Sequence, residues 1–434
     1  MKRKTGEKLQ PLKPFKITRS KEKITNKIGL PLIEQIAEKL DLREKIDKLF
    51  PKPGSNRGIK ASDFVMTLVH MMIDGAMHLE DVNHLLADEG YKELLKEMDL
   101  PSADAIGDWL RRHGGKQSER WIWEVISRVL SVTGKEGKTL DIDTTIIEAD
   151  KGDAQRTYKG IYGYQPLIGI IAENGMIAGG DFREGNVSPQ SGLVEFIEVC
   201  RKNYNQEIKL VRSDSAGWKK EIVDYCNKEK IGFTITTDQT EPVLEAIKSI
   251  PEEQWQRGID KEGIKEEYEI AESVYFFGAK KRLVRLVAKR VRLKRQYDLF
   301  LSYSYWIVAT NLRKEECDSQ EVIHIHQGRG SMEKRIGELK HQLNINRLPC
   351  GQFDANCLYF TIGLLAYNLL QLLKLIGLPE EYHRKTVKTL RYQLIKLAGK
   401  VITHARYKIL QIAAPLKNIE LFKGAYYRIR FAPL

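Results

Sequence analysis

The sequence predicts an α/β protein whose mixed-sheet core carries a β-rich insertion and is flanked by helical N- and C-terminal regions. Before residue 113 the apolar residues recur at helical spacing, as in Leu32, Ile33, Ile36, Ala37 and Leu40. After Gly137 short apolar segments typical of strands appear between helical ones. Beyond residue 352 the helical pattern returns. The sheet is therefore expected in the middle of the chain.

Length and charge restrict the class of protein further. A chain of 434 residues has room for about two to four domains of roughly 100–200 residues each. Its net charge of +13, from 71 basic and 58 acidic residues, favours a polyanionic partner, most simply nucleic acid. A merely basic soluble protein is the alternative.

The cysteines and the N-terminus predict a cytoplasmic protein. The five cysteines are odd in number and include no C-x-x-C pair, which predicts reduced thiols rather than disulfides or a zinc site. No apolar segment follows the basic start Met1-Lys2-Arg3-Lys4, so a secretory signal is not expected.

The N-terminal part is expected to hold a basic flexible arm, 1–25, and a helical DNA-binding domain, 26–136. One helix of this domain is predicted to begin after the N-cap Ser102 and to end in Arg111, Arg112 and His113. Arg111 and Arg112 would then contact DNA from the end of a reading helix. An ordinary helix of a small bundle explains the pattern equally well.

The first part of the core, 137–239, is predicted from five strand segments and two helical ones, 191–203 and 217–229. The strands are expected at 138–143, 166–172, 176–182, 208–213 and 232–237. The first three are close enough in sequence for antiparallel pairing, and the last two require crossovers. Three paired strands followed by α/β crossovers are the order of the RNase H-like fold.

Residues 240–310 interrupt this alternation of strands and helices, and their pattern predicts a β-rich insertion. Nine cations and no acid lie between Lys280 and Arg295. Strand alternation places Arg290, Arg292 and Lys294 on one face, where they would bind phosphates. A solvated edge strand that uses lysine and arginine against aggregation is the alternative.

The remaining segments are predicted to be helical. Residues 311–350 would return to the core with a helix, and 351–434 would form a helical C-terminal region that includes 355–377, 392–398 and 406–410. The apolar run 358–378 has nearly the length of a membrane span. Polar residues interrupt it at helical spacing, so a buried core helix is expected and a membrane is not.

Aspartates end two of the predicted strands. Asp143 ends the first, with Asp141 two residues earlier on the same face, and Asp214 ends the fourth. The first and fourth strands are neighbours in an RNase H-like sheet, so Asp143 and Asp214 would adjoin. Carboxylates at such a place can hold the Mg²⁺ ions of phosphodiester cleavage.

The later run that contains His326, Arg329, Glu333 and Lys340 gives these carboxylates a family context. Its spacings match the Tyr-x₂-Arg-x₃-Glu-x₆-Lys signature of bacterial insertion-sequence DDE transposases, with histidine in place of tyrosine. The chain resembles in particular the branch called transposase DDE domain group 1. Further segments that carry the resemblance are Leu140–Thr145, Gly163–Leu167, Phe182–Pro189, Arg212–Gly217 and Ala366–Leu369.

The resemblance implies a cut-and-paste transposase that binds terminal inverted repeats and acts as a homodimer on double-stranded DNA near the nucleoid. Asp143, Asp214 and Glu333 would be its catalytic triad and would hold two Mg²⁺ ions, for which Mn²⁺ could substitute. Asp141 is a possible further ligand or an alternative first member of the triad. Phosphate binding is implied for Arg329 and Lys340, and His326 could donate a hydrogen bond in place of the tyrosine.

Two other functions fit part of the pattern. Asp141 and Asp143 also match the nucleophile loop of haloacid-dehalogenase-like phosphatases. No later acidic pair of the kind that binds magnesium in those enzymes follows Asp214. A non-catalytic DNA-binding derivative of a transposase is the third possibility.

Overall fold

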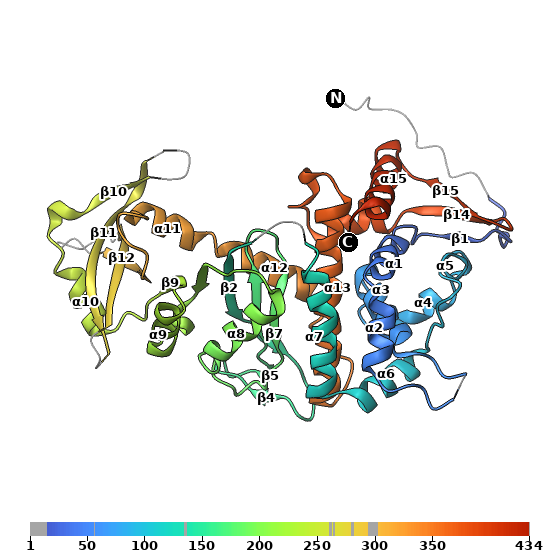
Figure 1. Ribbon diagram of the computed structural model, residues 1–434, viewed down its shortest axis with the longest axis horizontal. Helices are drawn as coiled ribbons and strands as arrows, with labels where there is room; N and C mark the ends of the chain where they lie inside the picture. Colours follow the sequence, from blue (N-terminus) through green and yellow to red (C-terminus); the bar gives the residue numbers. More distant parts are fainter. Residues whose placement is uncertain are drawn as a thin grey trace, which may run out of the picture.

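The computed structural model describes residues 15–433, except for 56, 134–136, 260–262, 264, 279–281 and 294–302. The molecule is elongated (Figure 1). The insertion lies at one end, the N-terminal helices lie at the other, and the core sheet lies between them. Arg290 and Arg292 of the predicted basic strand are described, whereas Lys294 lies outside the described residues, as do residues 1–14 of the predicted arm.

The core strands confirm the RNase H-like order. They are β2 (Thr139–Thr144), β6 (Leu167–Ile171), β7 (Ile177–Asp181), β8 (Leu210–Ser213) and β9 (Gly232–Thr236). They lie side by side in the order β7-β6-β2-β8-β9. β2 pairs in parallel with β8, and β8 with β9, whereas β6 and β7 are antiparallel neighbours. The two parallel pairs place the C-terminal ends of β2 and β8 at one edge of the sheet.

Helices α8 (Leu193–Tyr204) and α9 (Lys220–Lys228) make the crossovers that the parallel strands need. α8 packs on β7 through its buried residues Phe196 and Cys200. A Cβ atom at Gly169 would lie 2.6 Å from the Cys200 sulfur, so this close approach of helix and sheet requires glycine there.

The insertion extends the core sheet and does not form a separate one. It consists of α10 (Glu241–Lys248), β10 (Gln256–Ile259), β11 (Lys265–Phe277), β12 (Arg282–Arg292) and β13 (Tyr303–Thr310). β13 pairs antiparallel with β9, which makes a single sheet of nine strands among the described residues. The chain then returns along α11 (Ser319–Gln327) and α12 (Gly330–His341) to the edge where β2 and β8 end.

The N-terminal region is a bundle of helices. They are α1 (Leu30–Lys39), α2 (Leu42–Leu49), α3 (Ala61–Asp74), α4 (Val82–Leu86), α5 (Glu89–Leu94), α6 (Ala103–His113) and α7 (Lys116–Leu130). The Ser102 hydroxyl accepts a hydrogen bond from the Ala105 amide at 3.3 Å, which confirms the predicted N-cap of α6. The loop after β2 adds a small sheet of β3 (Ile147–Glu148), β4 (Gln155–Arg156) and β5 (Tyr162–Tyr164).

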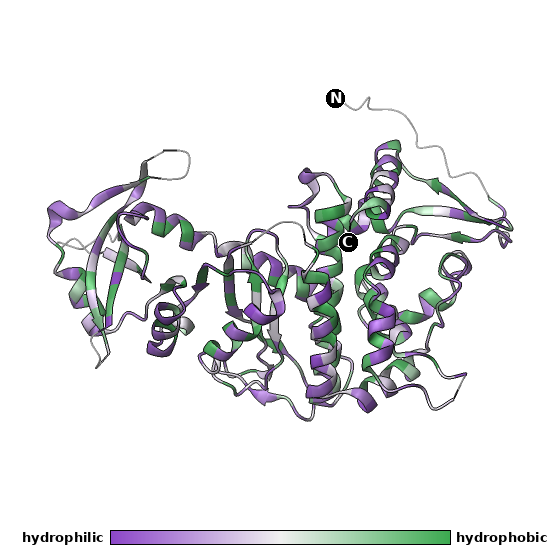
Figure 2. Cartoon of the chain, viewed as in Figure 1, coloured by the Kyte–Doolittle hydropathy of each residue, from purple (hydrophilic) through white to green (hydrophobic). Residues whose placement is uncertain are grey.

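The long apolar helix α13 (Phe353–Leu372) joins the two halves of the molecule. It packs against α3, α6 and α7 on one side and β7 on the other. Figure 2 colours most of this helix as hydrophobic, and its residues are buried from Ala355 to Leu372. By length and composition alone, the segment Phe353–Gly377 is long and apolar enough to cross a membrane. Its burial confirms the prediction of a core helix.

The C-terminal region differs from the predicted all-helical pattern. α14 (Val387–Leu390) and α15 (Leu416–Phe431) are helical, but β14 (Ala398–Thr403) and β15 (Lys408–Ala413) form a hairpin. The predicted helix at 406–410 is therefore wrong. β-branched residues such as Val401 and Ile412 suit a pleated strand, and this preference prevails over the short helical pattern. β1 (Ile24–Thr25) pairs with β14, so the predicted flexible arm does not extend through residue 25.

Asn368 of α13 supplies backbone hydrogen bonds to the edge strand β7. Its amide oxygen accepts from the Ile177 N–H at 2.8 Å, and its amide nitrogen donates to the Ile177 carbonyl at 2.9 Å. Both residues are fully buried. The side chain thus replaces the neighbouring strand that the edge of the sheet lacks, and it fixes α13 to the core.

The substitution Asn368→Leu should destabilise the protein by at least about 2 kcal/mol, because two buried backbone groups lose their partners. The thermal unfolding midpoint measures this loss. Thr361→Val is the matched control, since the Thr361 hydroxyl donates only to Cys357 within α13. Equal unfolding midpoints for the two variants would contradict the bridging role of Asn368.

Candidate active site

Three carboxylates meet at the edge of the sheet where β2 and β8 end. Asp143 is the second-to-last residue of β2, and Asp214 directly follows β8. The two strands are parallel, with Ile142 opposite Ser213, so their C-terminal aspartates become neighbours. Glu333 comes from the first turn of α12. The structure thus brings together the three residues proposed as a triad.

The guanidinium of Arg329 lies among these carboxylates. Its Nη2 atom is 2.8 Å from Asp143 Oδ2 and 3.9 Å from Asp214 Oδ2. Its Nη1 atom is 4.0 Å from Glu333 Oε1. One cation therefore faces three anions that come from two strands and a helix, and this arrangement offsets their mutual repulsion.

Burial and neighbouring charge perturb the proton affinity of Asp143. Burial raises the pKa of its carboxyl to about 6, and the nearby Asp214 and Glu333 act in the same direction. The Arg329 guanidinium and the Thr144 amide, which donates to Asp143 Oδ1 at 2.9 Å, oppose the increase. A carboxyl with a pKa near neutrality and several charged neighbours is typical of a functional site.

The three carboxylates differ in exposure. The Asp143 side chain is 15% exposed, that of Asp214 43% and that of Glu333 71%. Asp214 Oδ1 accepts from the Ala216 amide at 3.1 Å, while Oδ2 faces Arg329. Among the residues that the structure describes, no three such side chains are grouped tightly enough to hold a metal ion. Asp143 and Asp214 nevertheless lie within 4 Å of one nitrogen of Arg329, and Glu333 lies 4.0 Å from the other nitrogen of the same guanidinium.

Lys340 fixes the loop that follows β2. Its Nζ atom donates to the Ile146 carbonyl at 2.7 Å and to the Thr145 hydroxyl at 3.3 Å. Burial lowers the pKa of Lys340. In this arrangement the lysine holds protein groups two and three residues beyond Asp143. Its predicted phosphate contact stays a prediction.

The prediction that His326 contacts phosphate is wrong. The imidazole is buried, and its two nitrogens are each 2.9 Å from a hydroxyl of β9, Nδ1 from Thr234 and Nε2 from Thr236. Burial lowers the pKa of His326 to about 3, so the ring is neutral near neutral pH. His326 instead attaches α11 to β9, and Trp306 packs beside its ring.

Asp141 is not available as a metal ligand or a nucleophile. It is fully buried and paired with Arg212, with Nε–Oδ1 at 2.5 Å and Nη2–Oδ2 at 2.7 Å. The two residues are directly opposite in the register of β2 and β8. Both carboxylate oxygens are engaged, which corrects the assignment of Asp141 as a possible ligand and removes the nucleophile that a phosphatase would need.

Arg212, which the sequence did not single out, also positions the turn that carries Arg329. Its Nη1 atom donates to the Ile325 carbonyl of α11 at 2.6 Å. A Cβ atom at Gly328 would collide with this guanidinium. One side chain therefore joins β2, β8 and the α11–α12 junction, and the strand register is the only signal that could have revealed it.

The basic strand of the insertion is partly neutralised by acids from other elements. Arg290, predicted to bind phosphate, is only 3% exposed and pairs with Glu252 at 2.5 Å and Glu269 at 2.7 Å. Its guanidinium lies 4.1 Å from the ring centres of both Trp255 and Tyr303. The phosphate-binding prediction is therefore wrong for Arg290. Arg292 is exposed and stays a candidate.

Arg111 and Arg112 lie at the C-terminal end of α6, as predicted. Arg111 pairs with Asp108 one turn earlier at 2.6 Å, and both side chains are exposed. Arg112 is also exposed. An exposed ion pair of this kind contributes little to stability, so Arg111 could exchange Asp108 for a phosphate at little cost. The role of Arg111 and Arg112 in reading DNA stays a prediction.

The substitution Arg212→Met should reduce the free energy of unfolding by about 3–5 kcal/mol, because it leaves the buried Asp141 charge unpaired. The double variant Arg212→Met/Asp141→Leu should recover much of this loss. Urea unfolding measures both variants. A double variant less stable than the single one would contradict this account of the pair.

Comparisons with known proteins assign the family. The model of the family described as "Transposase DDE domain group 1" matches residues 12–434. A search of curated proteins gave no match. Among solved structures, a cryo-EM structure of a piggyBac transposase synaptic complex with hairpin DNA is similar, with 12% sequence identity and a TM-score of 0.47. That match covers 93% of this chain and 82% of the other. DDE transposases act on DNA with divalent metal ions. Because the family model spans nearly the whole sequence, the chain belongs to the transposase DDE domain group 1 family.

Proposed function

We propose that this protein is a DNA transposase that cleaves DNA at the ends of its own element and joins the freed 3′-hydroxyl to target DNA. The observation that carries the proposal is the meeting of Asp143, Asp214 and Glu333 around the Arg329 guanidinium. Asp143, Asp214 and Glu333 are its proposed catalytic residues.

The carboxylates fit a pair of Mg²⁺ ions, for which Mn²⁺ can substitute. Their oxygens are hard ligands, and Mg²⁺ keeps several of its own waters, so two or three carboxylates suffice. When bound, two such ions activate a water or a 3′-hydroxyl and stabilise the leaving oxygen. Asp143 is held by its strand and by the Thr144 amide, and Asp214 by the Ala216 amide. These contacts fix the direction of both carboxylates before any ligand arrives.

Arg329 is the proposed phosphate contact of the site. A guanidinium binds two phosphate oxygens at once in a fixed geometry. The Nε atom of Arg329 is buried and has no acceptor in the part of the chain that the structure describes. The planar group can therefore gain hydrogen bonds when a phosphate lies between it and the carboxylates.

The DNA and the assembly are proposed on charge and on the logic of the reaction. A net charge of +13 favours binding of double-stranded DNA, including the terminal inverted repeats of the element. Cut-and-paste transposition must bring two ends together, so we propose a homodimer on DNA. The protein would act in the cytoplasm, associated with the nucleoid. A phosphatase is disfavoured because Asp141 is buried and paired.

Strand cleavage of DNA that carries the terminal repeats, with Mg²⁺ present, tests the function. Asp214→Ala should reduce the cleavage rate by at least about 100-fold, which corresponds to ~2.7 kcal/mol of transition-state stabilisation. Glu198→Ala removes an exposed carboxylate of α8 and should leave the rate unchanged. Equal rates for wild type and Asp214→Ala would exclude this triad. Absence of cleavage by the wild type would favour a non-catalytic DNA-binding derivative.

Binding of Mn²⁺ should depend on pH because Asp143 must lose its proton to become a ligand. Since the pKa of its carboxyl is about 6, the affinity for Mn²⁺ should fall as the pH is lowered through that value. Arg329→Gln removes the cation that lowers this pKa, so the midpoint should move to higher pH. Mn²⁺ titrations followed by electron paramagnetic resonance give both midpoints. The exposed Arg384 provides the control Arg384→Gln, and an unchanged midpoint in Arg329→Gln would contradict the coupling.

A further inference from the structure

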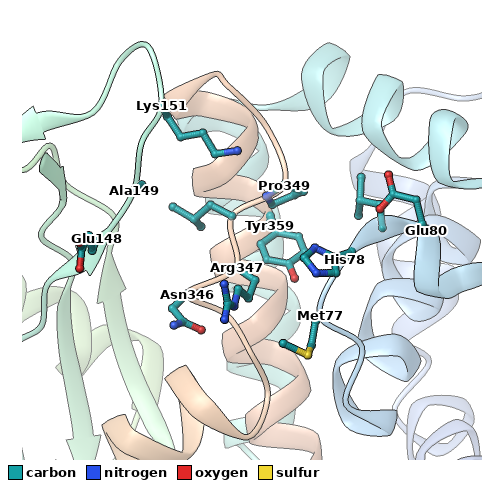
Figure 3. A pocket seen from close by; sticks show the side chains of 12 residues that line it. Met77, His78, Glu80, Glu148, Ala149, Lys151, Asn346, Arg347, Pro349 and Tyr359 are labelled. Atoms are coloured by element: carbon teal, nitrogen blue, oxygen red, sulfur yellow. The ribbon is translucent and has the colours of Figure 1, made fainter.

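A cavity of about 410 Å³ lies where the N-terminal helices meet the core (Figure 3). We call it the junction pocket. Its walls come from the turn before α4 with His78, from the loop after β3 with Lys151, from the segment after α12 with Arg347, and from Tyr359 of α13. Its volume is in the usual range of small-molecule pockets. The proposed reaction assigns no role to the residues of this pocket.

Five polar side chains that line the junction pocket have no hydrogen-bond or ion-pair partner among the described residues. In the described part of the chain, the side chains of Glu148, Lys151, Asn346, Arg347 and Tyr359 make no hydrogen bond or ion pair. Figure 3 shows Asn346, Arg347 and Tyr359 converging on the space between the loops. A site with so many unused donors and acceptors is suited to a ligand that carries both kinds of group.

The pocket contains both acidic and basic side chains, and this combination suits a nucleobase better than a phosphate. A phosphate has only acceptors, and the carboxylate of Glu148 would repel it. The edge of a base presents amino donors beside ring-nitrogen and carbonyl acceptors. Glu148 can accept from the amino group of a base, while Arg347 and Asn346 can donate to its acceptors. The apolar wall that includes Leu348 and Pro349 can cover the face of a base.

The junction pocket is close to the carboxylates along the chain. Glu148 follows Asp143 by five residues, so their Cα atoms are at most about 18 Å apart. That length corresponds to about five steps of a DNA strand. Lys340 holds Ile146 between the two places, which fixes the pocket relative to the site. A strand whose phosphate lies at Asp143 can therefore reach the pocket with a nucleotide a few steps away.

We propose that the junction pocket binds one unpaired nucleobase of the DNA strand held at the carboxylates. The proposal rests on the proposed function. A base inside a duplex is stacked and paired, so it must leave the stack to enter such a cavity. Arg347, Asn346 and Glu148 would hold its edge, and the gain from these contacts would offset the cost of unstacking.

Binding of terminal-repeat duplexes in EDTA, followed by fluorescence anisotropy, tests the proposal. Duplexes that carry one unpaired nucleotide, placed in turn at each of several positions near the cleavage point, are compared with the fully paired duplex. The wild type should prefer one of the bulged duplexes by about tenfold. Arg347→Ala and Glu148→Gln should abolish this preference while they retain affinity for the paired duplex.

Two controls make the outcome decisive. Arg384→Ala removes an exposed cation elsewhere and should keep the preference. Tyr359→Phe, which deletes one hydroxyl, reports on the pocket if either of the other variants fails to fold. Absence of any preference in the wild type would overturn the proposal. If Arg347→Ala reduced the affinity for bulged and paired duplexes equally, the proposal would also be overturned. Arg347 would then contact only the phosphate backbone of the DNA.

The same proteins separate this proposal from the function itself. Binding is measured without divalent ions, and cleavage is measured with Mg²⁺. If the protein prefers a bulged duplex but does not cleave DNA, the proposed reaction is contradicted and the proposed role of the pocket stands. Mg²⁺-dependent cleavage without a bulge preference would contradict the pocket alone.

Discussion

The buried pair of Asp141 and Arg212 is the contact on which the candidate site depends. It joins β2 to β8 side by side, and the C-terminal ends of these strands carry Asp143 and Asp214. The same guanidinium holds the Ile325 carbonyl and thereby sets where α12 begins. A buried ion pair is a poor source of stability but a good source of geometric definition when its hydrogen bonds are satisfied. Here that definition relates two strands and a helix that have no local reason to meet.

Much of the core could be predicted from the sequence because its signals are local. Alternation and β-branched residues locate the five strands, and their spacing along the chain leaves few ways to connect them. The N-cap at Ser102 and the buried helix α13 are equally local features. The hairpin of β14 and β15 was missed because each strand is short, and because the strand β1 that pairs with β14 is about 375 residues away.

The site was harder to predict because its residues are used in ways that only tertiary contacts decide. Asp141 and Asp143 look equivalent in sequence, yet one faces Arg212 and the other faces the sheet edge. Arg290 looks unpaired along its own strand, but its acids come from Glu252 and Glu269. His326 occupies a signature position, although it shares the buried face of α11 with Val322 and Ile323. That apolar face was the signal for burial.

The pairing of β13 with β9 has a mechanical consequence. A domain on a flexible linker can turn without disturbing its neighbour, but a strand bonded into the same sheet cannot. The strands of the insertion and those of the catalytic edge therefore belong to one continuous sheet. His326 attaches α11 to β9 of this sheet. If bound DNA displaced the distant end of the insertion, the continuous sheet would transmit that displacement to the start of α12.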